Sequence, residues 1–135
     1  MLQHDLLLYH FTSDLHVQGC LREGLTRGVT PKQVGPAGKV SFIHKTQWLT
    51  KNPDFNQSWA QHSTLPYDRT ANRLTVVIPH GRTHNICRWS KFGLLLPKQT
   101  YDALSIYGDP GNWFIYIGTI PPEWIVEVTK KNARS

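Results

Sequence analysis

Five consecutive residues near the start of the chain, Tyr9-His10-Phe11-Thr12-Ser13, bring together side chains that can bind a polar ligand. The imidazole of His10 can donate or accept a hydrogen bond near neutral pH, and Thr12 and Ser13 add two hydroxyl groups. Ser13 and Asp14 are residue types that cap the free N–H groups of a helix start, which carry a partial positive charge. The segment therefore predicts a site for phosphate or ribose oxygens. The alternative is that His10 is a core or edge residue and that Ser13 is only a cap.

Other side chains could extend this site. Arg73 leads into an apolar, β-branched segment and could meet a phosphate as a bidentate donor. Trp48, Trp59 and Trp113 could stack on a base or on a nicotinamide ring. Each has a structural alternative, which is a solvated surface position for the arginine and core packing for the tryptophans.

Apolar runs and chain breakers predict the elements that hold these residues. The run from Leu6 to His10 predicts a strand, and a short helix follows that ends at Gly24. The segment 28–38 holds two Pro and three Gly and is expected to be a long loop. Helical turns are expected at 56–62 and a helix at 98–107, after Pro97. Further strands are expected at 39–43, 48–50, 74–78, 113–117 and 124–128.

Predicted strands outnumber predicted helices, which indicates the α+β class. We expect one domain over residues 1–135, with a curved or split, mainly antiparallel sheet and a few short helices.

Four stretches resemble ADP-ribosyltransferase-like proteins, including the DNA-targeting ADP-ribosyltransferase toxins and, more distantly, the RNA 2′-phosphotransferases. Leu8-Tyr9-His10-Phe11-Thr12-Ser13 and Cys20-Leu21-Arg22-Glu23-Gly24-Leu25 resemble the start of that fold. Trp48-Leu49-Thr50 resembles its middle strand, and Ile120-Pro121-Pro122-Glu123-Trp124-Ile125 resembles its last corner.

The resemblance implies an ADP-ribosyltransferase-like fold that uses NAD as cofactor and acts on a nucleic acid. It also implies that His10 and a neighbouring hydroxyl face the nicotinamide ribose. The residues expected to bind the cofactor are Tyr9, His10, Thr12, Ser13, Trp48 and Thr50.

The catalytic carboxylate of the family has no match at its usual place. In the resembling toxins it lies on the strand before the last corner, but the strand 113–117 holds no acidic residue. Glu127 on the last strand is the first candidate to replace it, and Asp109 and Glu123 are the others. Alternatively, the chemistry rests on His10 and Arg73, as the likeness to the 2′-phosphotransferases implies.

Three functions are therefore compared: an ADP-ribosyltransferase-like enzyme, a non-catalytic nucleotide- or nucleic-acid-binding domain on the same fold, and a protein-interaction module. Convergence of His10, Thr50 and an acid in one cleft favours the enzyme. Convergence without an acid favours the binding domain, and dispersal of these side chains favours the interaction module.

Composition and charge indicate which partners and which location to expect. The 135 residues carry a net charge of +6, which favours nucleotide phosphates or nucleic acid as partners, although a merely basic surface is the alternative. No apolar run approaches the roughly 18 residues of a membrane span, so we expect a cytoplasmic protein with no membrane partner. Cys20 and Cys87 do not make a disulfide framework, and the pair His80 and His84 does not predict a metal site.

Overall fold

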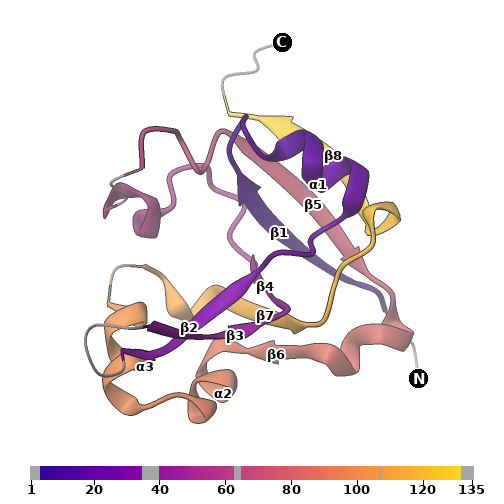
Figure 1. Cartoon of the computed structure of the whole chain (residues 1–135). Coiled ribbons are helices and arrows are strands. Elements are labelled where there is room, and N and C mark those ends of the chain that lie inside the picture. Colours follow the sequence, from indigo (N-terminus) through magenta and orange to yellow (C-terminus); the bar gives the residue numbers. More distant parts are fainter. Residues whose placement is uncertain (1–3, 35–39, 63–64, 107, 132–135) are drawn as a thin grey trace.

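The apolar run after Asp5 forms strand β1 (Leu6–Thr12), which lies in the middle of an antiparallel sheet. The computed structural model describes residues 4–34, 40–62, 65–106 and 108–131. Within these residues the main sheet has six strands in the order β6-β7-β4-β1-β5-β8 (Figure 1). Its other strands are β4 (Thr46–Thr50), β5 (Asn72–Ile78), β6 (Ile86–Arg88), β7 (Trp113–Ile117) and β8 (Ile125–Lys130).

The sheet is continuous on one side of β1 and opens on the other. β1 pairs with β5 along its whole length, from Leu6 opposite Ile78 to Thr12 opposite Asn72. Its register with β4 consists of a single pair, Tyr9 opposite Thr50. Beyond this pair the C-terminal half of β1 and the N-terminal half of β4 separate, so the described sheet is split between its two central strands.

Helix α1 (Val17–Glu23) follows β1 as the sequence predicts. The Val17 N–H donates to the Ser13 carbonyl (3.0 Å) in the turn before the helix, and the Gly24 N–H donates to Cys20 (2.8 Å) at its end. The cap predicted at Ser13 or Asp14 is wrong, because the N-cap residue is His16 and no side chain caps the helix. Gly24 has φ 83°, a conformation that side chains disfavour, and a methyl group there would collide with the Ile120 carbonyl.

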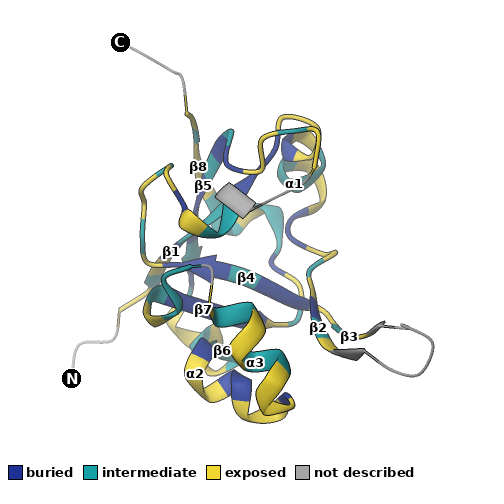
Figure 2. Ribbon diagram, turned by 90° about the vertical axis from the view of Figure 1, so that its left-hand side faces the viewer, coloured by how far each residue is buried: buried dark blue, intermediate teal, exposed yellow. Residues whose placement is uncertain are grey.

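Each face of the sheet carries its own apolar core. α1 packs on one face, over a cluster that contains Leu8, Leu74, Val76 and Ile120. The other face carries Trp113 and Ile115 and is covered by α2 (Trp89–Phe92) and α3 (Lys98–Ser105). Figure 2 shows the buried central strands and the exposed outer sides of α2 and α3.

The predicted loop 28–38 is wrong for its first part, which forms strand β2 (Val29–Val34). β2 pairs only with β3 (Val40–His44) in a separate two-stranded sheet among the described residues. Pro31 lacks an N–H, which suggested a loop, but the ladder is irregular between Pro31 and Gln33 and tolerates it. The rest of this prediction, 35–39, lies outside the described residues.

The other predicted elements differ from the structure mainly in length. The turns expected at 56–62 form the 3₁₀ helix η2 (Ser58–His62). The expected helix 98–107 is α3, and Tyr107 lies outside the described residues. The remaining 3₁₀ helices are η3 (His80–Asn85), η4 (Gly93–Leu95), η5 (Pro110–Asn112) and η6 (Pro122–Trp124).

The expected single domain of mixed α and β structure, with a mostly antiparallel sheet and few helices, is thus confirmed. None of the described helices has the length and apolar character that crossing a membrane requires.

Candidate functional site

Two adjoining cavities lie where β1 and β4 separate. The first, of about 560 Å³, is called the aromatic cavity because Tyr9, Trp48, Trp59 and Trp113 line it. The second, of about 760 Å³, is called the helix-side cavity because residues of α1 form its wall. Four residues line both cavities, namely His10, Phe11, Gly28 and Arg69.

The residues expected to bind a cofactor all line one of these cavities. Tyr9, Trp48 and Thr50 line the aromatic cavity. Thr12 and Ser13 line the helix-side cavity. His10 belongs to both, so the two cavities meet at its side chain.

Strand alternation explains how one short segment serves both cavities. Successive side chains of a strand point to opposite faces, so Tyr9 and Phe11 lie on one face of β1 and His10 and Thr12 on the other. In a continuous sheet, β4 would cover the edge between these faces. Because β1 and β4 separate after the Tyr9–Thr50 pair, both sets of side chains reach the opening.

His10 bridges the split. Its Nδ1 lies 2.8 Å from the carbonyl oxygen of Trp48 on β4. A carbonyl can only accept, so Nδ1 carries the proton and Nε2 of the neutral ring is left as an acceptor. Burial lowers the pKa of His10, the bond to Trp48 opposes this, and the charge of Arg69 lowers the pKa further. The partly buried ring is therefore neutral at pH 7.

Arg69 is a cavity residue that the sequence reasoning missed. Its exposed guanidinium lies over the ring of Trp59, 5.0 Å from the centroid. Among the described residues, none of the five ion pairs includes Arg69. The only signal in the sequence is an arginine ten residues after a tryptophan.

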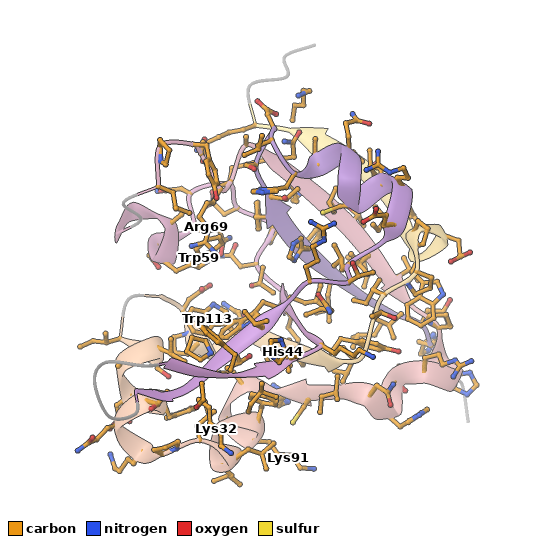
Figure 3. All side chains as sticks on the ribbon, viewed as in Figure 1. Lys32, His44, Trp59, Arg69, Lys91 and Trp113 are labelled. Carbon is orange, nitrogen blue, oxygen red and sulfur yellow. The ribbon has the colours of Figure 1, made fainter. Side chains whose placement is uncertain are left out.

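The aromatic cavity has a wall that is fixed by hydrogen bonds. The indole N–H of Trp113 donates to Asp109 (3.0 Å), and the Asn52 amide donates to the other oxygen of the same carboxylate (3.0 Å). Gln57, which is buried, donates to the Asn52 carbonyl (3.2 Å) and accepts from the indole N–H of Trp59 (3.1 Å). A continuous series of hydrogen bonds thus joins Trp113 to Trp59, and Figure 3 labels both of these cavity residues.

Asp109 is an acceptor in this series of hydrogen bonds and does not line either cavity. Its carboxylate accepts hydrogen bonds from Asn52, Asn112 and Trp113. Burial raises the pKa of Asp109, but these hydrogen bonds outweigh it and hold the pKa below its usual value. The carboxylate is therefore charged and engaged in structure.

Arg73 does not line the aromatic cavity, but it contacts Tyr9, which does. Its guanidinium lies between the rings of Tyr9 (5.3 Å) and Phe55 (5.0 Å), and Nη1 donates to the Pro53 carbonyl (2.8 Å). Arg73 is thus placed to support Tyr9 and the segment that leads to Trp59.

Glu127 lies away from both cavities. It is exposed on β8, at the outer edge of the sheet, and two strands separate β8 from β4. The acid that does line a cavity among the described residues is Glu23, in the helix-side cavity, where its carboxylate is 3.9 Å from Arg22 and 3.7 Å from Arg27. His10 and Thr50 therefore converge without an acid in the aromatic cavity.

In the described part of the chain, no group of three or more His, Cys, Asp or Glu side chains is placed to hold a metal ion. Cys20 and Cys87 are free thiols, each partly buried. Comparisons with protein-family models, with curated proteins and with solved structures gave no match to this chain.

Proposed function

We propose that this chain binds a dinucleotide, with NAD as the ligand, in the two cavities at the split between β1 and β4. One observation carries the proposal: His10 and Arg69 line both cavities. A ligand made of two parts can occupy both at once, and its central portion then passes an imidazole acceptor and a guanidinium.

The chemistry of the lining suits such a ligand. A flat heteroaromatic ring fits between tryptophan and tyrosine faces in the aromatic cavity. The diphosphate that joins the two halves of NAD would meet the guanidinium of Arg69, which forms no ion pair with a carboxylate among the described residues. Nε2 of His10 accepts a hydrogen bond from a ribose hydroxyl.

The resemblance of Tyr9-His10-Phe11-Thr12-Ser13 to ADP-ribosyltransferase-like proteins supports the same ligand. The split, mainly antiparallel sheet agrees with the expected fold class. We therefore propose an ADP-ribosyltransferase-like fold, with NAD as the molecule that its cleft recognises.

Binding is proposed before catalysis because the aromatic cavity has no acid among its described lining residues. Glu127 is on a distant strand and Asp109 is engaged by three donors. Within the described lining of that cavity, no carboxylate can stabilise the positive charge of a ribosyl transition state.

Transfer of ADP-ribose is the second candidate, and the free acceptor nitrogen of His10 favours it. In that reaction a hydroxyl or amine of the acceptor, for instance on a nucleic acid, forms a bond to C1′ of the nicotinamide ribose. The C1′–nitrogen bond breaks, and its electron pair leaves with neutral nicotinamide. Nε2 of His10 takes the proton that the acceptor loses.

Titration calorimetry with NAD, ADP-ribose and nicotinamide tests the binding proposal. We expect NAD to bind more tightly than either fragment, because it alone fills both cavities. Trp59→Ala should weaken NAD binding about 5- to 150-fold, since stacking contributes about 1–3 kcal/mol. Lys98→Gln is a control, because Lys98 is exposed, paired with Asp102 (2.7 Å) and outside both cavities. Absence of NAD binding would rule the proposal out.

Mass spectrometry of NAD incubated with the protein separates the two candidates. Release of nicotinamide together with ADP-ribose attached to an acceptor supports transfer. Tight binding with intact NAD supports the binding domain.

A further inference from the structure

Two cations share one aromatic ring, that of Phe114, which belongs to the core cluster on the α1 face of the sheet. Lys51 Nζ lies 5.2 Å from the ring centroid of Phe114, and the guanidinium carbon of Arg88 lies 5.4 Å from the same centroid. The two charges are therefore no farther apart than these distances added together. Both side chains are exposed, whereas Phe114 itself is buried.

The sheet register brings these residues together. Phe114 on β7 lies opposite Leu49 on β4 and opposite Arg88 on β6. Lys51 is two residues beyond Leu49, so it follows Leu49 on the same face. Arg88 ends β6 and Lys51 directly follows β4, and these two strands flank β7 in the sheet.

The two cations have no carboxylate partner among the described residues. None of the five ion pairs there includes Lys51 or Arg88. The segments 24–53 and 69–101, from which they come, contain no Asp or Glu. An anion that lies between the two like charges relieves their repulsion.

We propose that Lys51 and Arg88 form a phosphate-binding site that is separate from both cavities. Neither Lys51 nor Arg88 lines a cavity, so the site is independent of the proposed NAD site. The planar guanidinium of Arg88 binds two phosphate oxygens, and the ammonium of Lys51 binds a third or an adjacent phosphate. The phosphate belongs to a free nucleotide or to the backbone of a single-stranded nucleic acid.

Binding titrations of the full chain with a short oligothymidylate, with ADP and with inorganic phosphate test this site. The variants are Lys51→Gln, Arg88→Gln and the double variant, and each titration is repeated between about 50 and 200 mM salt. Lys98→Gln is the matched control, since it removes one exposed cation that is already paired with Asp102. Arg88→Lys keeps the charge and should retain part of the binding.

For a nucleic-acid backbone, we expect the double variant to lose oligothymidylate affinity and each single variant to lower the slope of log K against log salt by about 0.7. For a free nucleotide, ADP binding weakens in the double variant as well. NAD binding and the thermal midpoint should stay as in the unchanged protein. The proposal is overturned if the double variant binds all three probes like the unchanged protein, if Lys98→Gln lowers the slope equally, or if no probe binds.

Discussion

The ring of His10 on β1 donates from Nδ1 to the Trp48 carbonyl on β4, 2.8 Å away, across the point where these two strands separate. This bond fixes the tautomer of the ring and directs the remaining nitrogen, Nε2, away from Trp48. The proposed recognition of a ribose hydroxyl depends on that nitrogen.

His10→Asn tests the role of Nε2 alone. The asparagine amide can still donate to Trp48, but it offers no acceptor at the position of Nε2. We expect NAD affinity to fall about 3- to 10-fold, the effect of one lost hydrogen bond. The measurement is titration calorimetry, with the thermal midpoint as a check that the fold is kept. Unchanged affinity would remove His10 from the proposed contacts.

The same residue should make stability depend on pH. The pKa of His10 is lowered below 6.5 in the folded protein, mainly by burial. The unfolded chain therefore binds the proton more readily, and the free energy of unfolding is greatest above 6.5 and falls as the pH drops below it. Urea unfolding at about pH 7.5 and about pH 5.5 should show this loss, and His10→Asn should show less of it. Equal losses in both proteins would assign the effect to other groups.

Asp109 should affect the aromatic cavity from a distance. Asp109→Ala removes the acceptor of Trp113 and of Asn52, and should lower the free energy of unfolding by about 1–3 kcal/mol. It should also broaden the tryptophan fluorescence spectrum and weaken NAD binding, because the series of hydrogen bonds from Trp113 to Trp59 is interrupted. A variant that is destabilised but binds NAD normally would show that these hydrogen bonds serve folding only.

Two glycines of the α1 region should respond in opposite ways to alanine. Gly24 has φ 83° and faces the Ile120 carbonyl, so Gly24→Ala should cost at least about 2 kcal/mol of stability. Gly19 lies inside α1 with open space at its Cβ position, so Gly19→Ala should add about 0.5–1 kcal/mol. Chemical unfolding of both variants measures this difference. Equal effects would contradict the helix end described at Gly24.

Nucleotide binding should weaken as salt is added, because mobile ions screen the attraction of phosphates to Arg69 and to the net charge of +6. Arg69→Gln should lower NAD affinity at low salt and reduce the dependence on salt. Calorimetric titrations of both proteins at low and high salt measure these effects. Affinity that does not change with salt would argue against a site led by charge.

Local sequence signals predicted the elements whose structure is set by local chemistry. Gly24 marks the end of α1, and the strand 113–117 has the bounds of β7. The helix start was predicted too early, at Ser13 or Asp14, whereas the N-cap residue is His16. In contrast, β6 is three residues long and gave no pattern of its own, because its pairing with β7 defines it. β2 was missed because its composition resembles that of a loop.

The candidate site was predictable where its residues are adjacent in the sequence, as from Tyr9 to Ser13. Arg73 and Glu127 show the limit of this reasoning. Their distance from the cavities follows from strand order and register, and neither can be read from spacing along the chain. Arg69 was missed for the same reason, since its contact with Trp59 depends on the path of the segment between them.

Because successive side chains of β1 point to opposite faces, the number of residues in this strand affects both cavities more than most of its individual side chains do. One residue inserted between Leu8 and Tyr9 would turn every later side chain to the opposite face, so the imidazole and the phenol ring would exchange faces of the strand. The strand cannot absorb the change at its ends, because β5 pairs with it from Leu6 to Thr12 and the turn that leads into α1 starts at Ser13. Substitutions in this segment would alter the ligand that is bound, whereas insertions and deletions would dismantle both cavities together.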